Sequence, residues 1–359
     1  MLKKVKFVMV VILILSFITT AGIFSGCKGQ SIEKGTEEVA EEATDENPTY
    51  EEETREEETG EEPTNEEIVE VSTEPIQVVD GIEDEITLEK PAGKVIVFAP
   101  STLEIIDAIG GMNKVVGVDN WSVDNKEPLA EGFEGFGDYQ GFNMEKIIEV
   151  DPDLLIVLSG NSPEDIKKIK ELGISVYTAE AVNFQAAYVE IVNVGRMLDL
   201  EDKAAQVKDE FQSQVDEIYL KVKDLKDEEK PKVFYEIFND PLWSAGKDTF
   251  IDDLIEKAGG LNIVSLDGIE GYAEYSVEKL IENNPDIMIS GDGGMYEAKT
   301  VDIILDDARF SAVNAVINKK VYIVPENPIV RPNQNSIKGL TMFAKAIHPE
   351  IFGEFEVVE

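Results

Sequence analysis

Two similar segments recur in the sequence, and this internal repeat constrains the fold more than any other feature. Residues 143–156 read NMEKIIEVDPDLLI, and residues 276–289 read SVEKLIENNPDIMI. Both segments contain a polar residue, a Glu-Lys pair, two apolar residues, a further Glu and then a Pro-Asp pair before an apolar run. Each copy therefore predicts a short helix, capped by Asn143 or Ser276, that is followed by a strand.

A second pair of matching elements lies upstream of the two repeats. Residues 106–113 read IDAIGGMN, and residues 255–262 read IEKAGGLN. Because matching elements recur in the same order in each half, the sequence predicts two similar lobes.

Short runs rich in Val and Ile alternate with helical patterns through the part of the chain that we expect to fold, from about residue 78 to residue 352. These runs are residues 95–98, 115–118, 154–157, 175–177, 233–237, 287–289 and 321–324. Strands that alternate with helices predict an α/β fold in which parallel sheets are flanked by helices.

One long helix is predicted between the two halves. From residue 200 to about residue 225, apolar residues are spaced three and four apart, without Gly or Pro. At about 1.5 Å per residue this helix would be nearly 40 Å long. We therefore expect an N-terminal lobe at 78–199, a linking helix at 200–228 and a C-terminal lobe at 229–352. A ligand would bind in the cleft between the lobes, with a modest change of lobe angle.

The N-terminus has the layout of an export signal. Basic residues precede an apolar run that ends in small residues, which predicts a signal peptide at 1–26. The tetrapeptide from Phe24 to Cys27 resembles a lipobox, which implies that Cys27 is lipidated and begins the mature protein. An uncleaved membrane helix over residues 7–24 is the alternative. Both interpretations tether the folded part outside the cytoplasm.

An acidic stretch follows the predicted anchor. Residues 28–75 hold 19 acidic residues against 3 basic ones. Such a segment cannot bury enough apolar surface to fold, so residues 27–77 are predicted to be a lipidated cysteine and a disordered stalk. Loose capture of cations by this stretch is the alternative function.

The charge and the rare residue types exclude several functions. The chain has 74 acidic and 32 basic residues, so nucleic acid and acidic membrane surfaces are poor partners. One Cys and one His exclude a disulfide framework and the usual Cys/His metal clusters. An enzymatic triad would depend on His348 alone, so we expect no enzyme, no catalytic or metal-ligating residues and no cofactor.

Several motifs in the expected order resemble one family. They are residues 95–98, 110–117, 143–156, 243–247, 258–262 and 276–289. From about residue 78 to 352 the chain resembles the periplasmic binding proteins for vitamin B12 and iron siderophores, the two-lobe type with a helical backbone. The resemblance implies a monomer that binds a small molecule and delivers it to an ABC importer, whose permease dimer and ATPases are other chains.

Within this family the cobalamin binders are the most similar. Residues 138–145 resemble the loop that lines their cleft, but Tyr139 stands where they have Trp, and Tyr272 is its counterpart in the second half. The resemblance implies cobalamin or a related corrinoid, or a ferric siderophore, as the ligand. The alternatives are haem, bound through Tyr139 or Tyr272 as a phenolate, and a structural or adhesive surface domain without a ligand.

A corrin or siderophore complex is broad and partly apolar, so its site needs aromatic surfaces and a few polar anchors. The aromatic candidates are Trp121, Tyr139, Trp243, Tyr272 and Tyr275, each with a place in the core as the alternative. Arg331 is the polar candidate, through its planar donors, and Lys247 is a weaker one. In a chain this acidic, Arg331 has a second interpretation, an ion pair with a neighbouring carboxylate.

Glu145 and Glu278 occupy matching positions in the two repeats. The resemblance implies that each projects from the top of its lobe and binds an Arg of the permease. The alternative is local, because a Glu in the first turn of a helix is stabilised by the helix dipole, by about 0.3–1 kcal/mol.

Overall fold

The computed structural model describes residues 74–292 and 300–357. The first of its two four-stranded sheets consists of β3 (Val95–Val97), β4 (Val115–Val118), β7 (Leu154–Leu158) and β8 (Ser175–Ala179). The second consists of β9 (Lys232–Glu236), β12 (Leu261–Asn262), β14 (Ile287–Gly291) and β15 (Val321–Val324).

The two sheets have the same topology. Their strand orders are β4-β3-β7-β8 and β12-β9-β14-β15, and all neighbouring strands are parallel. In each sheet the second strand along the chain lies outside the first, and the third and fourth follow on the other side. This duplication confirms the predicted α/β fold with two similar lobes.

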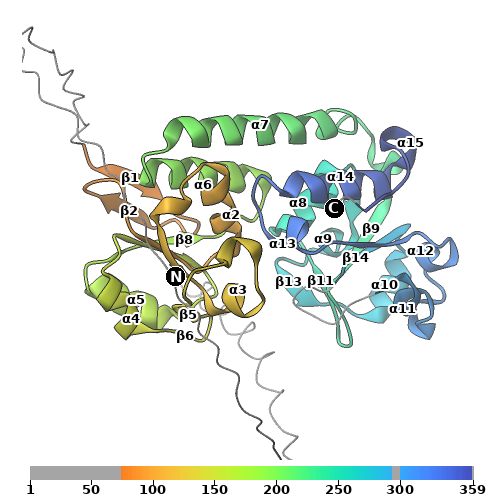
Figure 1. Cartoon of the computed structure of the whole chain (residues 1–359). Coiled ribbons are helices and arrows are strands. Elements are labelled where there is room, and N and C mark those ends of the chain that lie inside the picture. The colour runs from red at the N-terminus through yellow and green to blue at the C-terminus, as the bar shows by residue number, and fades with distance from the viewer. Residues whose placement is uncertain (1–73, 293–299, 358–359) are drawn as a thin grey trace, which may run out of the picture. The chain divides into compact units, whose positions relative to one another are not determined.

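Helices and short hairpins surround both sheets (Figure 1). In the N-terminal lobe they are β1 (Ile76–Val79), β2 (Glu85–Leu88), α2 (Pro100–Ala108), η2 (Met112–Lys114), α3 (Asn120–Asp124), η3 (Pro128–Ala130), β5 (Gly137–Asp138), β6 (Gly141–Phe142), α4 (Met144–Val150), α5 (Pro163–Glu171) and α6 (Phe184–Met197). After α7 (Glu201–Tyr219) and η4 (Asp227–Glu229), those of the C-terminal lobe are β10 (Phe238–Asn239), β11 (Leu242–Ala245), α8 (Phe250–Lys257), α9 (Ile263–Leu266), β13 (Tyr272–Glu274), α10 (Val277–Asn283), α11 (Val301–Leu305), η5 (Ala308–Phe310), α12 (Asn314–Ile317), α13 (Asn327–Val330), α14 (Ser336–Ile347) and α15 (Pro349–Phe352).

The repeated segments fold in the same way in both lobes, as α4 followed by β7 and as α10 followed by β14. The side chain of Asn143 caps α4 and that of Ser276 caps α10, each by accepting a hydrogen bond from a backbone N–H three residues on. Both helices end at a residue in the left-handed conformation, Asp151 with φ 51° and Asn284 with φ 48°, and a proline follows each. The predicted caps are therefore confirmed.

The Gly-Gly pairs of the upstream repeat also have a common role. Gly110 and Gly259 follow α2 and α8 and have φ angles of 79° and 84°, a conformation that residues with a Cβ atom rarely adopt. The second glycine of each pair lies against apolar side chains, with a Cβ at Gly260 coming within 2.8 Å of Val233. The repeat thus encodes the end of a helix and its close packing on the neighbouring elements.

The two lobes share one hydrophobic cluster, which extends from the N-terminal sheet through α6 and α7 to α8 and α14. At its centre the ring of Phe184 lies 5.0 Å from that of Phe250 and 5.7 Å from that of Phe211. The backbone N–H of Phe184 also donates to Asp253 at 2.7 Å. A shared core of this kind opposes wide separation of the lobes, because opening it would expose large aromatic side chains.

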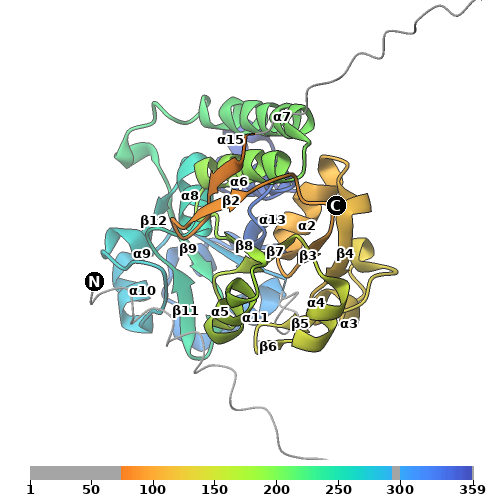
Figure 2. The same cartoon turned by 90° about the vertical axis from the view of Figure 1, so that its left-hand side faces the viewer.

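The linking helix is shorter than the periodicity predicts. Figures 1 and 2 both show α7 on the outer side of α6, with which it packs, and α7 ends at Tyr219 instead of about residue 225. At about 1.5 Å per residue its length is roughly 28 Å. Beyond it the backbone forms i→i+3 turns, in which the N–H of Val222 bonds to Tyr219 and that of Leu225 to Val222. Apolar residues that are three positions apart fall on one side of a helix and also on one side of successive i→i+3 turns. The apolar pattern therefore continues after the helix has ended.

The predicted signal peptide, Cys27 and almost all of the predicted stalk lie outside the described residues. Among residues 74–292 and 300–357, no helix is both long and apolar enough to cross a membrane.

Candidate functional site

A cavity of about 340 Å³ lies between the lobes. Its walls are Pro100, Leu103, Glu104, Ser122, Glu127, Pro128 and Leu129 of the N-terminal lobe and Asn327, Pro328, Arg331, Asn335 and Lys338 of the C-terminal lobe. This volume is at the small end of the range for ligand pockets, roughly 300–1,000 Å³. The cavity can therefore hold a small ligand or one edge of a large one.

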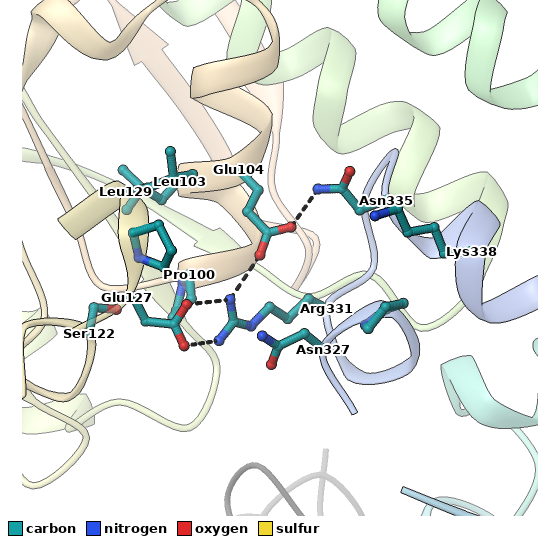
Figure 3. A pocket seen from close by; sticks show the side chains of 12 residues that line it. Pro100, Leu103, Glu104, Ser122, Glu127, Leu129, Asn327, Arg331, Asn335 and Lys338 are labelled. Atoms are coloured by element: carbon teal, nitrogen blue, oxygen red, sulfur yellow. Dashed lines mark hydrogen bonds and ion pairs between the residues drawn. The ribbon is translucent and has the colours of Figure 1, made fainter. Parts of the chain in front are cut away.

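Arg331 lies at this cavity and is already bound to carboxylates (Figure 3). Its Nη1 lies 2.8 Å from Glu104 Oε1, and its Nη2 lies 2.8 Å from Glu127 Oε1, with a further Nη1 contact to Glu127 Oε2 at 3.2 Å. Burial would lower the pKa of Arg331, but the hydrogen bonds to Glu127 and Glu104 outweigh burial and raise it. Of the two sequence interpretations, the carboxylate pair is therefore the one that the structure contains.

The segment after Arg331 fixes Glu104 from the other side. The side-chain amides of Asn333 and Asn335 donate to Glu104 Oε2 at 2.9 and 2.8 Å, and that of Gln334 donates to the Glu104 backbone carbonyl at 3.0 Å. Asn333 also donates to the carbonyl of Ser101 at 3.1 Å. Three consecutive carboxamides therefore attach the C-terminal lobe to α2. These residues were not predicted from the sequence, although a run of carboxamides directly after an arginine is a visible signal.

Trp121 belongs to α3 and lies beside Arg331. Asp119 caps α3 by accepting from the backbone N–H and the hydroxyl of Ser122 at 2.8 and 2.7 Å. Burial raises the pKa of Asp119, although the Ser122 hydrogen bonds and the charge of Arg331 act to lower it. The Trp121 ring is half-buried, with its centre 5.6 Å from the guanidinium carbon of Arg331. The indole therefore presents an aromatic surface next to the cavity.

Tyr139 lies at the tip of the β5–β6 hairpin. Its side chain is 46% exposed, and its hydroxyl accepts a hydrogen bond from the Gln140 amide at 2.8 Å. The hairpin is attached to α3, because the N–H of Gly137 donates to the side chain of Asn120 at 3.2 Å. Tyr139 and Trp121 thus come from two contacting elements of the same lobe.

An aromatic strip lies on the three-stranded sheet β10-β11-β13 of the C-terminal lobe. Trp243 is opposite Phe238 on one side and Glu274 on the other, and Tyr272 is opposite Ala245. Directly opposed residues of antiparallel strands share a face, so Phe238, Trp243 and Tyr272 lie on one face as direct or diagonal neighbours. Tyr272 is 50% exposed, and Trp243 and Phe238 are half-buried. Phe238 was missed by the sequence analysis.

The prediction that Tyr275 binds the ligand is wrong. Its side chain is 2% exposed and packs against Phe234 in the core of the C-terminal lobe, with the ring centres 5.5 Å apart. Its hydroxyl donates to Asp267 at 2.9 Å and accepts from Asn283 at 2.8 Å. Burial raises the pKa of Tyr275. Tyr275 follows the last residue of β13, where the chain turns inward and carries the ring into the core.

Lys247, the weaker polar candidate, is exposed just after β11. Its backbone bonds to Ile269 and Gly271, and its ammonium group makes no ion pair within the described residues. It remains a candidate without an assigned partner.

Glu145 and Glu278 have equivalent environments on α4 and α10. Both are exposed, and neither makes an ion pair or side-chain hydrogen bond within the described part of the chain. The neighbouring lysines are held elsewhere: Lys146 bonds to Glu134 at 3.1 Å and Lys279 to Asp267 at 3.2 Å. Both carboxylates are therefore available to an outside cation. Figures 1 and 2 show both helices well away from α7.

The remaining titratable candidate is structural. His348 is 3% exposed, with Nδ1 at 2.9 Å from Glu350 and Nε2 at 3.1 Å from the carbonyl of Gly259. Within residues 74–292 and 300–357, no group of three or more His, Cys, Asp or Glu side chains is arranged to hold a metal ion.

Comparison with known proteins agrees with this geometry. A family model described as "Periplasmic binding protein" matches residues 95–328. YvrC of Bacillus subtilis (strain 168), an uncharacterized ABC transporter substrate-binding lipoprotein, is 30% identical over 78% of this chain and 88% of its own length. The vitamin B12-binding protein of Vibrio campbellii is 25% identical over 70% of this chain and 88% of its own.

A crystal structure gives the same result. A possible iron-binding (periplasmic solute-binding) protein of Staphylococcus epidermidis superimposes with a TM-score of 0.61 and 28% identity, over 72% of this chain and 99% of that one. Family model, relatives and fold therefore agree, and this chain belongs to the periplasmic binding protein family of extracytoplasmic, ABC-importer-associated solute-binding proteins.

Proposed function

We propose that this protein captures cobalamin or a related corrinoid between its lobes and delivers it to an ABC importer. The observation that carries the proposal is the placement of aromatic side chains. Trp121 and Tyr139 lie on contacting elements of one lobe, and the strip containing Trp243 and Tyr272 lies on the other. The cavity between the lobes is lined from both sides. A corrin ring has a broad apolar face and amide edges, which suit aromatic side chains on both lobes and polar groups in the cavity between them.

A ferric siderophore is the near rival within the same class. The Vibrio campbellii relative is a vitamin B12-binding protein, whereas the Staphylococcus epidermidis structure is that of a possible iron-binding protein. Tyr139 and Tyr272 present smaller faces than the tryptophans of cobalamin binders, which leaves room for a less planar ligand.

Tryptophan fluorescence tests the site directly, because the chain has two tryptophans and each lobe carries one. In the Trp121→Phe variant the remaining fluorophore reports on the C-terminal lobe, and in Trp243→Phe it reports on the N-terminal lobe. Binding between the lobes predicts quenching in both variants at the same ligand concentration. Quenching in one variant only would place the ligand on a single lobe and contradict the proposal.

Haem is a second candidate because each lobe has a half-exposed tyrosine, Tyr139 at 46% and Tyr272 at 50%. A tyrosine phenolate can ligate haem iron, and ligation would produce a shifted Soret band on mixing with haemin. The expected outcome for a corrinoid binder is an unchanged haemin spectrum. A shifted band that disappears in Tyr139→Phe or Tyr272→Phe would replace the corrinoid by haem.

For delivery, we propose that Glu145 and Glu278 each bind an arginine of the permease dimer. Lys146 and Lys279, which could have neutralised them, are paired with carboxylates of their own lobes. Two equivalent acidic positions, one on each lobe, match the two-fold symmetry of a permease made of two identical subunits.

The test is uptake by cells that carry Glu145→Ala and Glu278→Ala together. Charge pairs across an interface contribute upwards of about 1.5 kcal/mol, so docking should weaken roughly tenfold for each pair lost, with ligand affinity unchanged. The matched control is Glu149→Ala with Glu282→Ala, which removes exposed glutamates one turn further along the same helices. Equal uptake by both double variants would refute the docking role.

We also propose that Cys27 carries the lipid anchor and that residues 28–75 form the stalk above the membrane. Labelling of the chain by a radioactive fatty acid, and loss of the label in Cys27→Ser, is the expected result. An unlabelled chain that remains membrane-bound would favour the uncleaved helix over residues 7–24.

A further inference from the structure

The cavity between the lobes contains a buried arginine whose charge is more than balanced. The side chain of Arg331 is 10% exposed, and those of Glu104 and Glu127 are 17% and 19% exposed. The guanidinium and its two carboxylate partners have a net negative charge, and the exposed Lys338 adds one positive charge to the lining of the cavity.

This arrangement is fixed by bonds from both lobes. Glu104 cannot swing away from Arg331 without losing the amide bonds from Asn333 and Asn335 at 2.9 and 2.8 Å. Both carboxylate oxygens of Glu127 accept hydrogen bonds from the guanidinium, at 2.8 and 3.2 Å. The guanidinium is therefore not available to a ligand carboxylate or catecholate unless one of these pairs breaks. Breaking a partly buried pair leaves an uncompensated charge and is costly.

The two carboxylates still have capacity for donors. Each oxygen of Glu127 accepts one N–H from Arg331, and a carboxylate oxygen can accept about two hydrogen bonds. An amide NH₂ or an ammonium group entering the cavity thus finds acceptors, whereas an anion meets two carboxylates and a guanidinium that they already occupy. The lining is otherwise supplied by apolar side chains, amides and the exposed Lys338.

We infer that Glu104 and Glu127 are specificity-determining residues that keep Arg331 from binding anions, so that the cavity selects the amide-edged or cationic edge of a ligand and rejects polyanionic ones. This inference rests on the proposed capture of a ligand between the lobes, and it names the chemical class of that ligand.

The test compares ligands that share a frame and differ in charge. Dicyanocobinamide carries amides around the corrin ring, and dicyanocobyrinic acid carries carboxylates on the same ring. A ferric hydroxamate and a ferric tris-catecholate form a second pair. Titration calorimetry with the purified full chain should show that the amide or hydroxamate member binds and that its anionic partner binds at least about a hundredfold more weakly, since charges a few ångströms apart interact strongly at partly buried sites.

Glu127→Gln and Glu104→Gln each remove one negative charge and release part of the guanidinium. Each substitution should tighten binding of the anionic ligand about tenfold or more. It should therefore reduce the difference in affinity between the anionic ligand and its neutral partner. The matched control is Glu171→Gln, which removes an exposed carboxylate paired with Lys167 at 3.6 Å on the surface of α5. This variant should leave the difference in affinity between the two ligands unchanged. Thermal melting of each variant shows that it is folded, and two separate variants keep the test valid where one is unstable.

The outcomes separate the two proposals. The charge selection is overturned if an anionic ligand binds the wild-type chain as tightly as its neutral partner. It is also overturned if Glu127→Gln and Glu104→Gln both leave the difference in affinity between the two ligands unchanged. In either case the proposed capture of a ligand stands. Absence of binding by all four ligands overturns the proposed function itself, and the selection with it.

Discussion

Glu190 should make the stability of this protein depend on pH. It lies on α6 with 4% of its surface exposed, and its carboxylate accepts a hydrogen bond from the hydroxyl of Thr102 on α2 at 2.6 Å. Burial raises the pKa of Glu190 from 4.5 to about 7, and the Thr102 hydrogen bond only partly opposes this. The buried carboxyl group is therefore protonated more readily in the folded chain than in the unfolded chain.

The sign and the size of the effect follow from this difference. Between pH 4.5 and pH 7 the folded state binds more protons than the unfolded state, so stability decreases as the pH rises through this window. At about 1.4 kcal/mol for each pKa unit, the total is about 3 kcal/mol of unfolding free energy.

The Glu190→Gln variant removes this titration and keeps an acceptor for Thr102. Urea unfolding of both proteins between about pH 4 and pH 8 should give equal stabilities at the acidic end and a variant that is more stable by about 3 kcal/mol at the alkaline end. Glu210→Gln, at an exposed position on α7, is the control and should track the wild type. A wild type and a Glu190→Gln variant with the same pH dependence would show that Glu190 does not have a raised pKa in the folded chain.

Three further changes test the packing and the assignment of Tyr275. Tyr275→Phe loses hydrogen bonds with Asp267 and Asn283 and should cost about 1–2 kcal/mol in denaturant unfolding, yet calorimetry should find ligand affinity unchanged, because the ring is in the core; a lost affinity would return Tyr275 to the site. Gly195→Val should cost about 1–3 kcal/mol, since a Cβ there meets Ala204 of α7; a thermal melt equal to the wild type would show that α6 and α7 can move apart. Asn143→Ala should cost about 1 kcal/mol by removing the cap of α4, and Asn143→Ser should recover most of it; equal losses in both would exclude capping as the cause.

The fold was predictable because its signals are local and are repeated. Each apolar run that predicts a strand is one in the structure, and the two copies of the capped helix and the Gly-Gly pair occupy equivalent places in both lobes. The short hairpins were missed because strands of two residues, such as β5 and β10, are too short to display alternation. The end of α7 was missed because the apolar spacing is the same in the turns that follow it.

The site was predictable in part, and the reason is sequence distance. Glu104 and Glu127 are 227 and 204 residues away from Arg331 in the chain, so no local pattern indicates that they meet. Trp121, Tyr139, Trp243 and Tyr272 are all at least partly exposed, as a ligand-binding role requires. Tyr275 is buried although its neighbour Ser276 is polar, because Ser276 caps α10 and does not line a cleft.

Titration calorimetry of the purified chain against cyanocobalamin, dicyanocobinamide, a ferric hydroxamate and haemin tests the proposed ligand class. We expect submicromolar binding of one ligand molecule per chain for a corrinoid, or else for the ferric hydroxamate, and no binding of haemin. A chain that binds none of them, or that binds haemin alone, would show that the aromatic side chains of the two lobes do not hold an amide-edged ligand.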